Sequence, residues 1–257
     1  MLGKLSILVP VFNEAATVER LLRRVAEVSF PIEREIVAVD DGSSDGSREV
    51  LQRLGQEGLI RWVAHEVNRG KGAAVQTAVR HAQGDVLVVQ DADLELDPGE
   101  LPGLLAPILN GETSVCYGSR FLNGASAALR RRPAYWANRL LNALSNRLNG
   151  LRITDFNTCY KMMTAQVMHQ LDLTQNGFAL EPEITTKLAR LGYTIVERPI
   201  RYQPRSVAAG KKIRAADFFK YVAVMVRCRL LWSPSQVPSI GTGMSPSPSL
   251  SVAEMPG

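Results

Sequence analysis

Cysteine is scarce in this sequence, and the few cysteines are not spaced for a metal site. Cys116, Cys159 and Cys228 are the three cysteines among 257 residues. A small odd number without a C-x-x-C pair argues against a disulfide scaffold and against a zinc site. This usage is typical of a protein in a reducing compartment.

Long apolar runs are also missing. Residues 218–226 come nearest, but they include Lys220 and fall well short of the roughly 18 apolar residues of a membrane span. The apolar run at residues 7–12 is too short for a signal peptide, so none is expected. We therefore expect a cytoplasmic protein without a transmembrane helix.

Two glycine-rich nucleotide motifs are absent as well. The chain has no G-x-x-x-x-G-K-[ST], which excludes a P-loop, and no G-x-G-x-x-G after its first predicted strand, which argues against a dinucleotide redox cofactor. A shorter loop is present at Gly70-Lys71-Gly72, where backbone N–H groups and one ammonium could meet a phosphate.

Charge is distributed unevenly along the chain. Residues 1–119 have 11 Lys and Arg against 18 Asp and Glu, a net −7, whereas residues 120–232 have 19 against 6, a net +13. A basic second half suggests an anionic partner, namely nucleic acid, a phosphate ligand or anionic lipid, although solvated surface residues account for many of these charges. The 46% apolar and 21% charged content is ordinary for a soluble globular protein.

The first half alternates strand and helix patterns. Strands are expected at residues 5–12, 35–39, 59–64, 85–90 and 114–118, with helical patterns between them. Such alternation with short loops predicts an α/β fold, a mostly parallel sheet flanked by helices. The length allows one large domain or two small ones.

Polar clusters follow four of these strands, at residues 13–14, 40–41, 68–71 and 91–95. The carboxyl ends of parallel strands share one edge of a sheet, so we expect a binding site there. If the chain stays extended beyond Gln90, residues 91, 93 and 95 project to one side, and their carboxylates suit Mg²⁺ or Mn²⁺. The alternative is a solvated loop leading to a helix capped by Asp97.

The second half yields open alternatives. Asp155 is a turn residue or a helix cap, and Glu181 and Glu183 are capping candidates at the start of a helix through residue 191. Residues 193–202 alternate as a strand, and residues 204–212 form a basic loop able to close over a ligand. The helix at 215–232 is interfacial or core-packing, and residues 233–257 are predicted to be a disordered Ser/Pro-rich tail.

Four longer motifs stand at the predicted strand ends, P-V-F-N-E at 10–14, D-D-G-S-S-D at 40–45, N-R-G-K-G at 68–72 and D-A-D at 91–93. Together they resemble the motifs of family 2 inverting glycosyltransferases of the GT-A fold. The resemblance covers about residues 4–230 and is closest to the branch of dolichyl-phosphate mannose synthases and polyprenyl-phosphate glucosyltransferases. The motifs G-S-R at 118–120, T-C-Y-K at 158–161 and E-P-E at 181–183 support the branch.

The resemblance implies roles for individual residues. The nucleotide sugar would be bound by Pro10, Val11, Asn13, Glu14, Asp40, Lys71, Asp91 and Ala92. Asp91, Asp93 and Glu95 would hold Mg²⁺ or Mn²⁺, with Glu95 the weakest match. Donor and acceptor phosphates would meet Arg120, Arg205, Lys211 and Lys212. Asp93, Arg120 and Asp155 would be the catalytic group, with Glu181 and Glu183 as further candidates.

The implied reaction is inverting transfer of one hexose, from a donor of the UDP-glucose or GDP-mannose type, to a polyprenyl or dolichyl phosphate at the inner membrane face. Residues 1–119 would form the nucleotide-sugar half and residues 120–232 the acceptor half of one domain. Because a lipid phosphate is already anionic near neutral pH, it needs cations and no general base. The absence of a Q-x-x-R-W motif also favours single-sugar transfer.

Two other interpretations remain. One is a glycosyltransferase acting on a soluble or protein-linked sugar hydroxyl, which needs a carboxylate base. The other is a non-catalytic binder of nucleotides or nucleic acid, which the acidic residues 91–95 disfavour because they repel nucleic acid.

Overall fold

A seven-stranded sheet forms the centre of the molecule. The structure is a computed structural model that describes residues 2–124, 130–131, 133–203 and 215–234. The strand order is β3-β2-β1-β4-β6-β5-β7. The strands are β1 (Lys4–Val11), β2 (Glu33–Asp40), β3 (Arg61–Ala64), β4 (Val86–Val89), β5 (Val115–Ser119), β6 (Lys161–Thr164) and β7 (Val196–Pro199).

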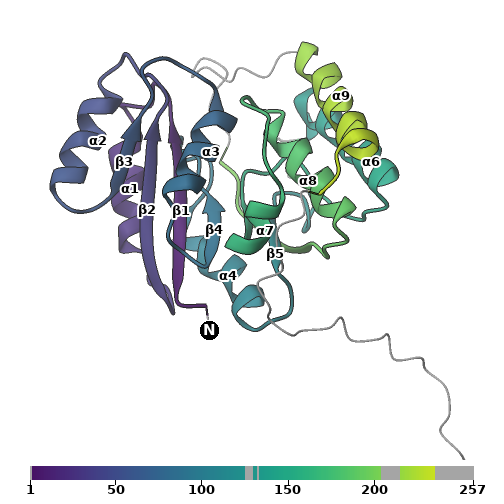
Figure 1. The fold of residues 1–257 in the computed structure, drawn as a ribbon, viewed down its shortest axis with the longest axis horizontal. Coiled ribbons are helices and arrows are strands. Elements are labelled where there is room, and N and C mark those ends of the chain that lie inside the picture. Colours follow the sequence, from purple (N-terminus) through teal and green to yellow (C-terminus); the bar gives the residue numbers. More distant parts are fainter. Residues whose placement is uncertain (1, 125–129, 132, 204–214, 235–257) are drawn as a thin grey trace, which may run out of the picture.

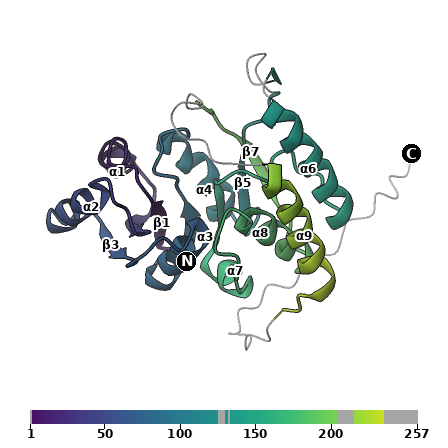
Figure 2. The ribbon, with the colours of Figure 1, turned by 90° about the horizontal axis from the view of Figure 1, so that it is seen from above.

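Helices cover both faces of this sheet (Figures 1 and 2). They are α1 (Val18–Glu27), α2 (Ser47–Gln56), α3 (Lys71–His81), the 3₁₀ turn η1 (Pro98–Glu100), α4 (Leu101–Leu109), α6 (Pro133–Asn149), α7 (Ala165–Gln170), α8 (Leu180–Arg190) and α9 (Ala215–Leu231). The predicted mostly parallel α/β architecture is confirmed.

One strand departs from the parallel pattern. β6 pairs antiparallel with both β4 and β5, whereas the other strand pairs in the described part of the chain are parallel. The sequence did not reveal β6 or the short helix α7 that follows it. Both elements are short, because β6 has four residues and α7 has six. The strand sequence, Lys-Met-Met-Thr, also lacks the run of β-branched residues that marks the other central strands.

Alternate residues of the central strands build two cores. In β1, Ile7 and Val9 pack with α1, α2 and α4, while Leu8 between them packs on the other side with α3 and the second-half helices. β1 and β4 are therefore apolar on both faces, as expected for strands buried between two helical layers.

The chain does not stay extended after β4, which corrects one expectation. Leu94 has a φ of 59°, so residues 92–95 make a turn before the isolated bridge between Leu96 and Tyr202. A leucine with positive φ is sterically unfavourable and is held here by its surroundings. The predicted strand at residues 193–202 is likewise shorter, since only β7 pairs regularly.

The second-half helices α6, α8 and α9 lie together at the end of the molecule away from α2 (Figure 1). One face of α9 is buried through Tyr221, Val224, Met225 and Cys228, so this helix does pack on the core. Its opposite face is exposed. None of the helices in the described residues has the length and apolar character needed to cross a membrane.

Candidate active site

A cavity of about 620 Å³ opens at the carboxyl ends of β1 and β4. Parallel α/β sheets bind ligands at this edge, and a cavity of this size accommodates a small organic ligand. The predicted residues that line it are Pro10, Val11, Asn13, Glu14, Lys71, Asp91, Ala92, Asp93, Glu95, Arg120 and Glu181.

Two loops that follow β1 and β2 are tied together at the cavity edge. The side-chain oxygen of Asn13 accepts a hydrogen bond from the Ser44 N–H at 2.9 Å, and the backbone N–H of Asn13 donates to Ser43 Oγ at 3.0 Å. Asn13 has a φ of 55°, which asparagine tolerates better than most residues. Asp45 accepts from the backbone N–H groups of Ala15 and of Ser47, the first residue of α2. The loops therefore support each other before any ligand binds.

Asp40 and Asp41 take different roles from those expected. Asp40 was predicted to line the nucleoside pocket, but it is fully buried, pairs with Arg48 at 2.8 Å and does not line the cavity. Its side chain lies on the same sheet face as Ala38, toward α2, because alternate residues share a face. The next residue, Asp41, lines the cavity instead.

Asp41 organises the loop that leads into α3. Its carboxylate accepts hydrogen bonds from the N–H groups of Arg69 and Gly70, at 2.9 and 2.7 Å, and from Asn68 Nδ2 at 3.0 Å. Asp41 Oδ1, which accepts the Arg69 N–H, also lies 2.7 Å from Nδ1 of the buried His65. The sequence placed Asp41 in the strand-end cluster at residues 40–41 without giving it a role of its own, and it did not single out His65.

Lys71 is the first residue of α3 and extends into the cavity. Its ammonium lies 2.8 Å from Asp91 Oδ1 and 3.3 Å from Glu181 Oε1. Burial opposes its charged form, but Asp91 and Glu181 outweigh that cost and raise the pKa of Lys71 well above its usual range. The pKa of Asp91 is lowered, because Lys71 outweighs the opposing effect of burial. Lys71 therefore remains a cation in this site.

Asp91, Asp93 and Glu95 all line the cavity. A turn of the chain brings them there, and not the extended backbone that the sequence suggested. Asp93 Oδ1 accepts the Glu95 N–H at 3.0 Å, and Asp91 is engaged by Lys71. Within the described residues, no group of three or more Asp, Glu, His or Cys side chains is arranged to hold one ion. The predicted three-carboxylate metal site is therefore not assembled by the protein side chains alone.

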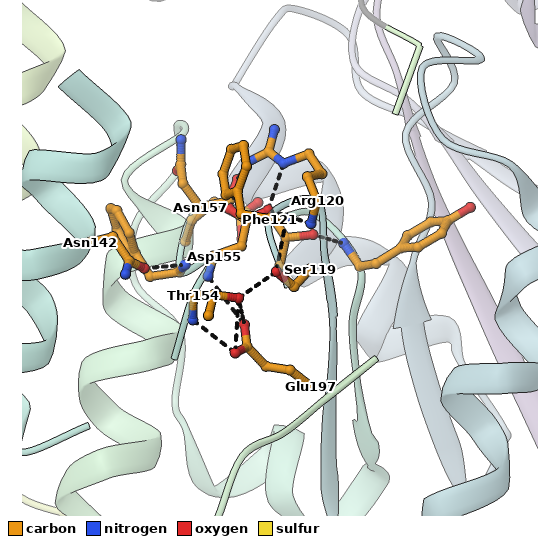
Figure 3. A network of polar contacts seen from close by, with 12 residues as sticks. Ser119, Arg120, Phe121, Asn142, Thr154, Asp155, Asn157 and Glu197 are labelled. Carbon is orange, nitrogen blue, oxygen red and sulfur yellow. Dashed lines mark hydrogen bonds and ion pairs between the residues drawn. The ribbon is translucent and has the colours of Figure 1, made fainter. Parts of the chain in front are cut away.

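Arg120 is the second cation of the cavity, and Asp155 fixes it (Figure 3). The guanidinium donates to both carboxylate oxygens of Asp155, from Nε at 2.6 Å and from Nη2 at 2.8 Å, and the Arg120 N–H adds a third bond at 3.1 Å. The rings of Phe121 and Tyr202 lie about 5 Å from the guanidinium, at 5.3 and 5.2 Å. Asp155 is fully buried and does not line the cavity, so it orients Arg120.

The segment that carries Asp155 is held from two sides, as Figure 3 shows. Glu197 on β7 accepts the N–H groups of Thr154 and Asp155 at 2.8 and 3.1 Å. From α6, Asn142 donates to the Ile153 carbonyl oxygen and accepts the N–H of residue 156. Burial raises the pKa of Glu197 above its ordinary value, and hydrogen bonds from residues 154 and 155 oppose that effect. The position of Arg120 therefore depends on residues that lie outside the cavity.

Glu181 and Glu183 stand two residues apart in α8 and have different partners. Glu181 bridges two lysines, because Lys161 Nζ lies 2.5 Å from its Oε2 and Lys71 lies beside its Oε1. Glu183 is fully buried, lies 2.8 Å from Lys187 Nζ and does not line the cavity. Both have specific ion-pair partners, which is more than the helix-dipole role that the sequence allowed.

Some cavity residues were not assigned a role from the sequence, and some assigned residues lie elsewhere. The residues lining the cavity beyond those predicted include Phe12, Asp41, Asn68, Asn157, Thr158, Cys159, Phe178, Tyr202 and Tyr221. Arg205, Lys211 and Lys212, as well as the predicted tail from residue 235 onward, lie outside the described residues.

Carboxylates outnumber basic side chains in the described lining of the cavity. Glu14, Asp41, Asp91, Asp93, Glu95 and Glu181 face Lys71 and Arg120. Carboxylate oxygens of this kind are ligands that Mg²⁺ and Mn²⁺ prefer. The chemistry of these oxygens therefore fits a hard divalent cation, although no three of the described side chains are arranged around one ion.

Solved structures with the same architecture show the fold class. The chain superimposes on glucosyl-3-phosphoglycerate synthase from Mycobacterium tuberculosis in complex with Mn²⁺, uridine diphosphate and glucosyl-3-phosphoglycerate, with a TM-score of 0.67 and 19% sequence identity. That match covers 94% of this chain and 83% of the solved one. The fold is therefore of the GT-A type.

Sequence comparisons then give the family. The profile of Glycosyl transferase family 2 matches residues 6–171, and the chain belongs to this family. It is 33% identical over 174 residues to dodecaprenyl-phosphate galacturonate synthase of Rhizobium johnstonii, covering 66% of this chain and 50% of that protein. It is 30% identical over 210 residues to undecaprenyl-phosphate 4-deoxy-4-formamido-L-arabinose transferase of Edwardsiella ictaluri, covering 80% of this chain and 62% of that protein. The chain thus spans about half to three-fifths of these relatives.

Proposed function

We propose that this protein transfers a single sugar, of the hexose type, from a nucleotide sugar to a polyprenyl phosphate, with inversion at the anomeric carbon. The observation that carries the proposal is the pair of carboxylate-paired cations, Lys71 and Arg120, in one cavity with the acidic residues of the strand ends. The names of the two relatives, both of which include a polyprenyl phosphate, support this acceptor.

The state of the carboxylates supports an anionic acceptor. Asp155 gives both oxygens to Arg120, while Asp91 and Glu181 are paired with lysines. An oxygen that already accepts from a neighbouring cation is not oriented to take a proton from a bound hydroxyl, and Asp155 does not line the cavity. A hydroxyl acceptor needs a general base, whereas a phosphate oxygen near pH 7 is already anionic. These three residues therefore suit a phosphate better than a hydroxyl.

The donor would lie along the acidic edge of the cavity. Pro10, Val11, Asn13 and Glu14 would meet the nucleoside with Asp41, in place of Asp40. A divalent cation held by Asp93, with Asp91 or Glu95, would offset charge on the departing diphosphate. Lys71 and Arg120 would hold the donor and acceptor phosphates close together despite their repulsion, by charge-assisted hydrogen bonds.

We also propose that the exposed faces of α6 and α9 contact the membrane that contains the acceptor. Trp136 and Leu140 are 63% and 59% exposed at helical spacing on α6, and Phe219, Leu230 and Leu231 are 70–76% exposed on α9. Exposed arginines on both helices fit the anionic lipid headgroups. Tyr221, on the buried face of α9, lines the cavity, so this helix adjoins the site.

A transfer assay tests the proposed reaction. The protein would be incubated with undecaprenyl phosphate and a panel of labelled UDP- and GDP-sugars, with Mn²⁺, with Mg²⁺ or with EDTA, and label would be counted in the organic phase. We expect metal-dependent label in that phase for one donor. Metal-dependent soluble product without lipid label would replace the acceptor by a soluble hydroxyl. Nucleotide binding without any transfer would leave the non-catalytic interpretation.

A further inference from the structure

Glu183 and Lys187 form a buried ion pair that the proposed reaction does not use directly. Their side chains are 0% and 1% exposed, with Lys187 Nζ 2.8 Å from Glu183 Oε1. Burying two charges is unfavourable unless each is paired and hydrogen-bonded. The partners of this pair therefore indicate what it holds in place.

The partners of Glu183 lie in the segment that precedes α8. Its carboxylate accepts the N–H groups of Thr174 and Gln175, at 3.0 and 2.9 Å, and the Thr174 hydroxyl at 2.7 Å. Lys187 Nζ donates to the carbonyl oxygen of Asp172 at 2.7 Å. The Trp232 ring, just beyond α9, lies 5.0 Å from the same ammonium. The ion pair thus fixes residues 172–175 on α8.

This segment in turn supports the glycine turn that carries Lys71. The Asn176 carbonyl oxygen accepts the Ala73 N–H at 3.0 Å, and Gln76 Nε2 donates to the Gln175 carbonyl oxygen at 3.1 Å. A Cβ atom on Gly70 or Gly72 would overlap these two carbonyl groups, so only glycine permits the approach. The backbone at residues 175–176 therefore packs directly against the start of α3 and supports it.

We propose that Glu183 and Lys187 are positioning residues for Lys71. They fix residues 172–175, and the carbonyl groups at 175–176 in turn hold the Gly70–Gly72 turn. The ammonium of Lys71 thereby reaches Asp91, Glu181 and the phosphates of the donor. The two glutamates of the E-P-E motif then serve the same lysine. Glu181 contacts the ammonium of Lys71, and Glu183 supports the backbone of Lys71 through residues 174–176. This role rests on the proposed function.

A double-mutant cycle on nucleotide affinity tests this role. Binding of uridine diphosphate and guanosine diphosphate with Mg²⁺ would be measured by calorimetry for the wild type, for E183Q/K187M, for K71M and for the triple variant. The double variant removes both buried charges together, so neither is left unpaired. We expect it to weaken nucleotide binding about tenfold in the wild-type background, equivalent to one charge-assisted hydrogen bond. In the K71M background we expect a further loss of less than about twofold.

Equal losses with and without Lys71 would overturn the inference, as would an unchanged affinity in E183Q/K187M. If that variant does not fold, T174V replaces it in the cycle, because it removes only the hydroxyl donated to Glu183. E112Q, which alters an exposed ion pair with Arg198, is the matched control and should bind as the wild type does. A wild type that binds neither nucleotide would instead overturn the proposed function.

Discussion

Arg120 and Lys71 line the same cavity, but their carboxylate partners differ in accessibility. The side chain of Asp155, the partner of Arg120, is 0% exposed and both its oxygens are bonded to the guanidinium. The side chain of Asp91, the partner of Lys71, is 30% exposed and itself lines the cavity. One cation is therefore bound to a carboxylate that no ligand reaches, and the other to a carboxylate that a ligand can reach.

This difference separates a fixed cation from one whose partner can change. If a donor and its metal ion bind as proposed, Asp91 would have a second cation to bind, and Lys71 would have a phosphate to contact. Arg120 has no such exchange, because Asp155 lies behind it. We infer that Arg120 provides a preorganised positive charge and that Lys71 completes its contacts as the donor binds.

The largest effect is expected at Asp93, one of the carboxylates that line the cavity with these two cations. Asp93→Asn keeps the oxygen that accepts the Glu95 N–H, so the fold should be retained. Loss of its charge at the diphosphate should lower transfer by about a thousandfold. Steady-state transfer with Mg²⁺ would measure this. Asp97→Asn, in the same loop but on a surface ion pair with Arg24, is the control, and equal effects in both would contradict the assignment.

Asp155→Asn tests whether Arg120 is the fixed cation. The change leaves a guanidinium without its buried counter-charge, which should lower the free energy of unfolding by about 3 kcal/mol and transfer by about a hundredfold. Asp91→Asn should cost less stability, since its site is partly solvated. Denaturant unfolding of both variants would compare them directly. The distinction fails if Asp91→Asn is the more destabilising change.

Lys71→Met tests the exchangeable cation. We expect nucleoside diphosphate affinity to fall about tenfold, because one charge-assisted contact is lost. The melting temperature should change less than in Asp155→Asn, because Asp91 remains accessible to water. Calorimetric binding and thermal unfolding together would show both effects. A variant with normal nucleotide affinity would remove Lys71 from the donor site.

The smallest effect concerns Glu197 and pH. Its folded-state pKa is raised above 4.5, chiefly by burial, so protonation stabilises the folded protein. That stabilisation is complete below the unfolded-state pKa and is lost as pH rises through the folded-state value. Glu197→Gln lacks this titration, so the free energy of unfolding of the wild type relative to the variant should increase from pH 7 toward pH 5. Urea unfolding at both pH values would detect it, and a constant difference would contradict it.

The sequence predicted the first half of the site better than the second. Strand-end clusters at residues 13–14, 68–71 and 91–95 meet at one edge because topology alone brings parallel strand ends together. Asp40 was misplaced because the strand continues through it, and alternation turns its side chain toward Arg48. The accessible neighbour Asp41 follows from the same alternation.

The second half depends on contacts that no local pattern encodes. Asp155 binds Arg120, which is 35 positions away in the sequence, and Glu197 binds Thr154, which is 43 positions away. In the sequence, Lys161 is a polar residue before an apolar pair, yet in the structure its side chain is buried against Glu181. These charges are arranged by tertiary packing around the antiparallel β6, which the sequence did not reveal. Their role as a cation group was foreseeable from net charge, but their pairings were not.

The most direct test compares two acceptors that differ only at the reacting oxygen. Undecaprenyl phosphate and undecaprenol would be offered at equal concentration in the same detergent, with the donor identified by the transfer assay. If held cations and an anionic acceptor replace a general base, sugar is transferred to the phosphate and not to the alcohol. Comparable transfer to the alcohol would contradict this account, because it would require a base that the paired carboxylates Asp91, Asp155 and Glu181 do not provide.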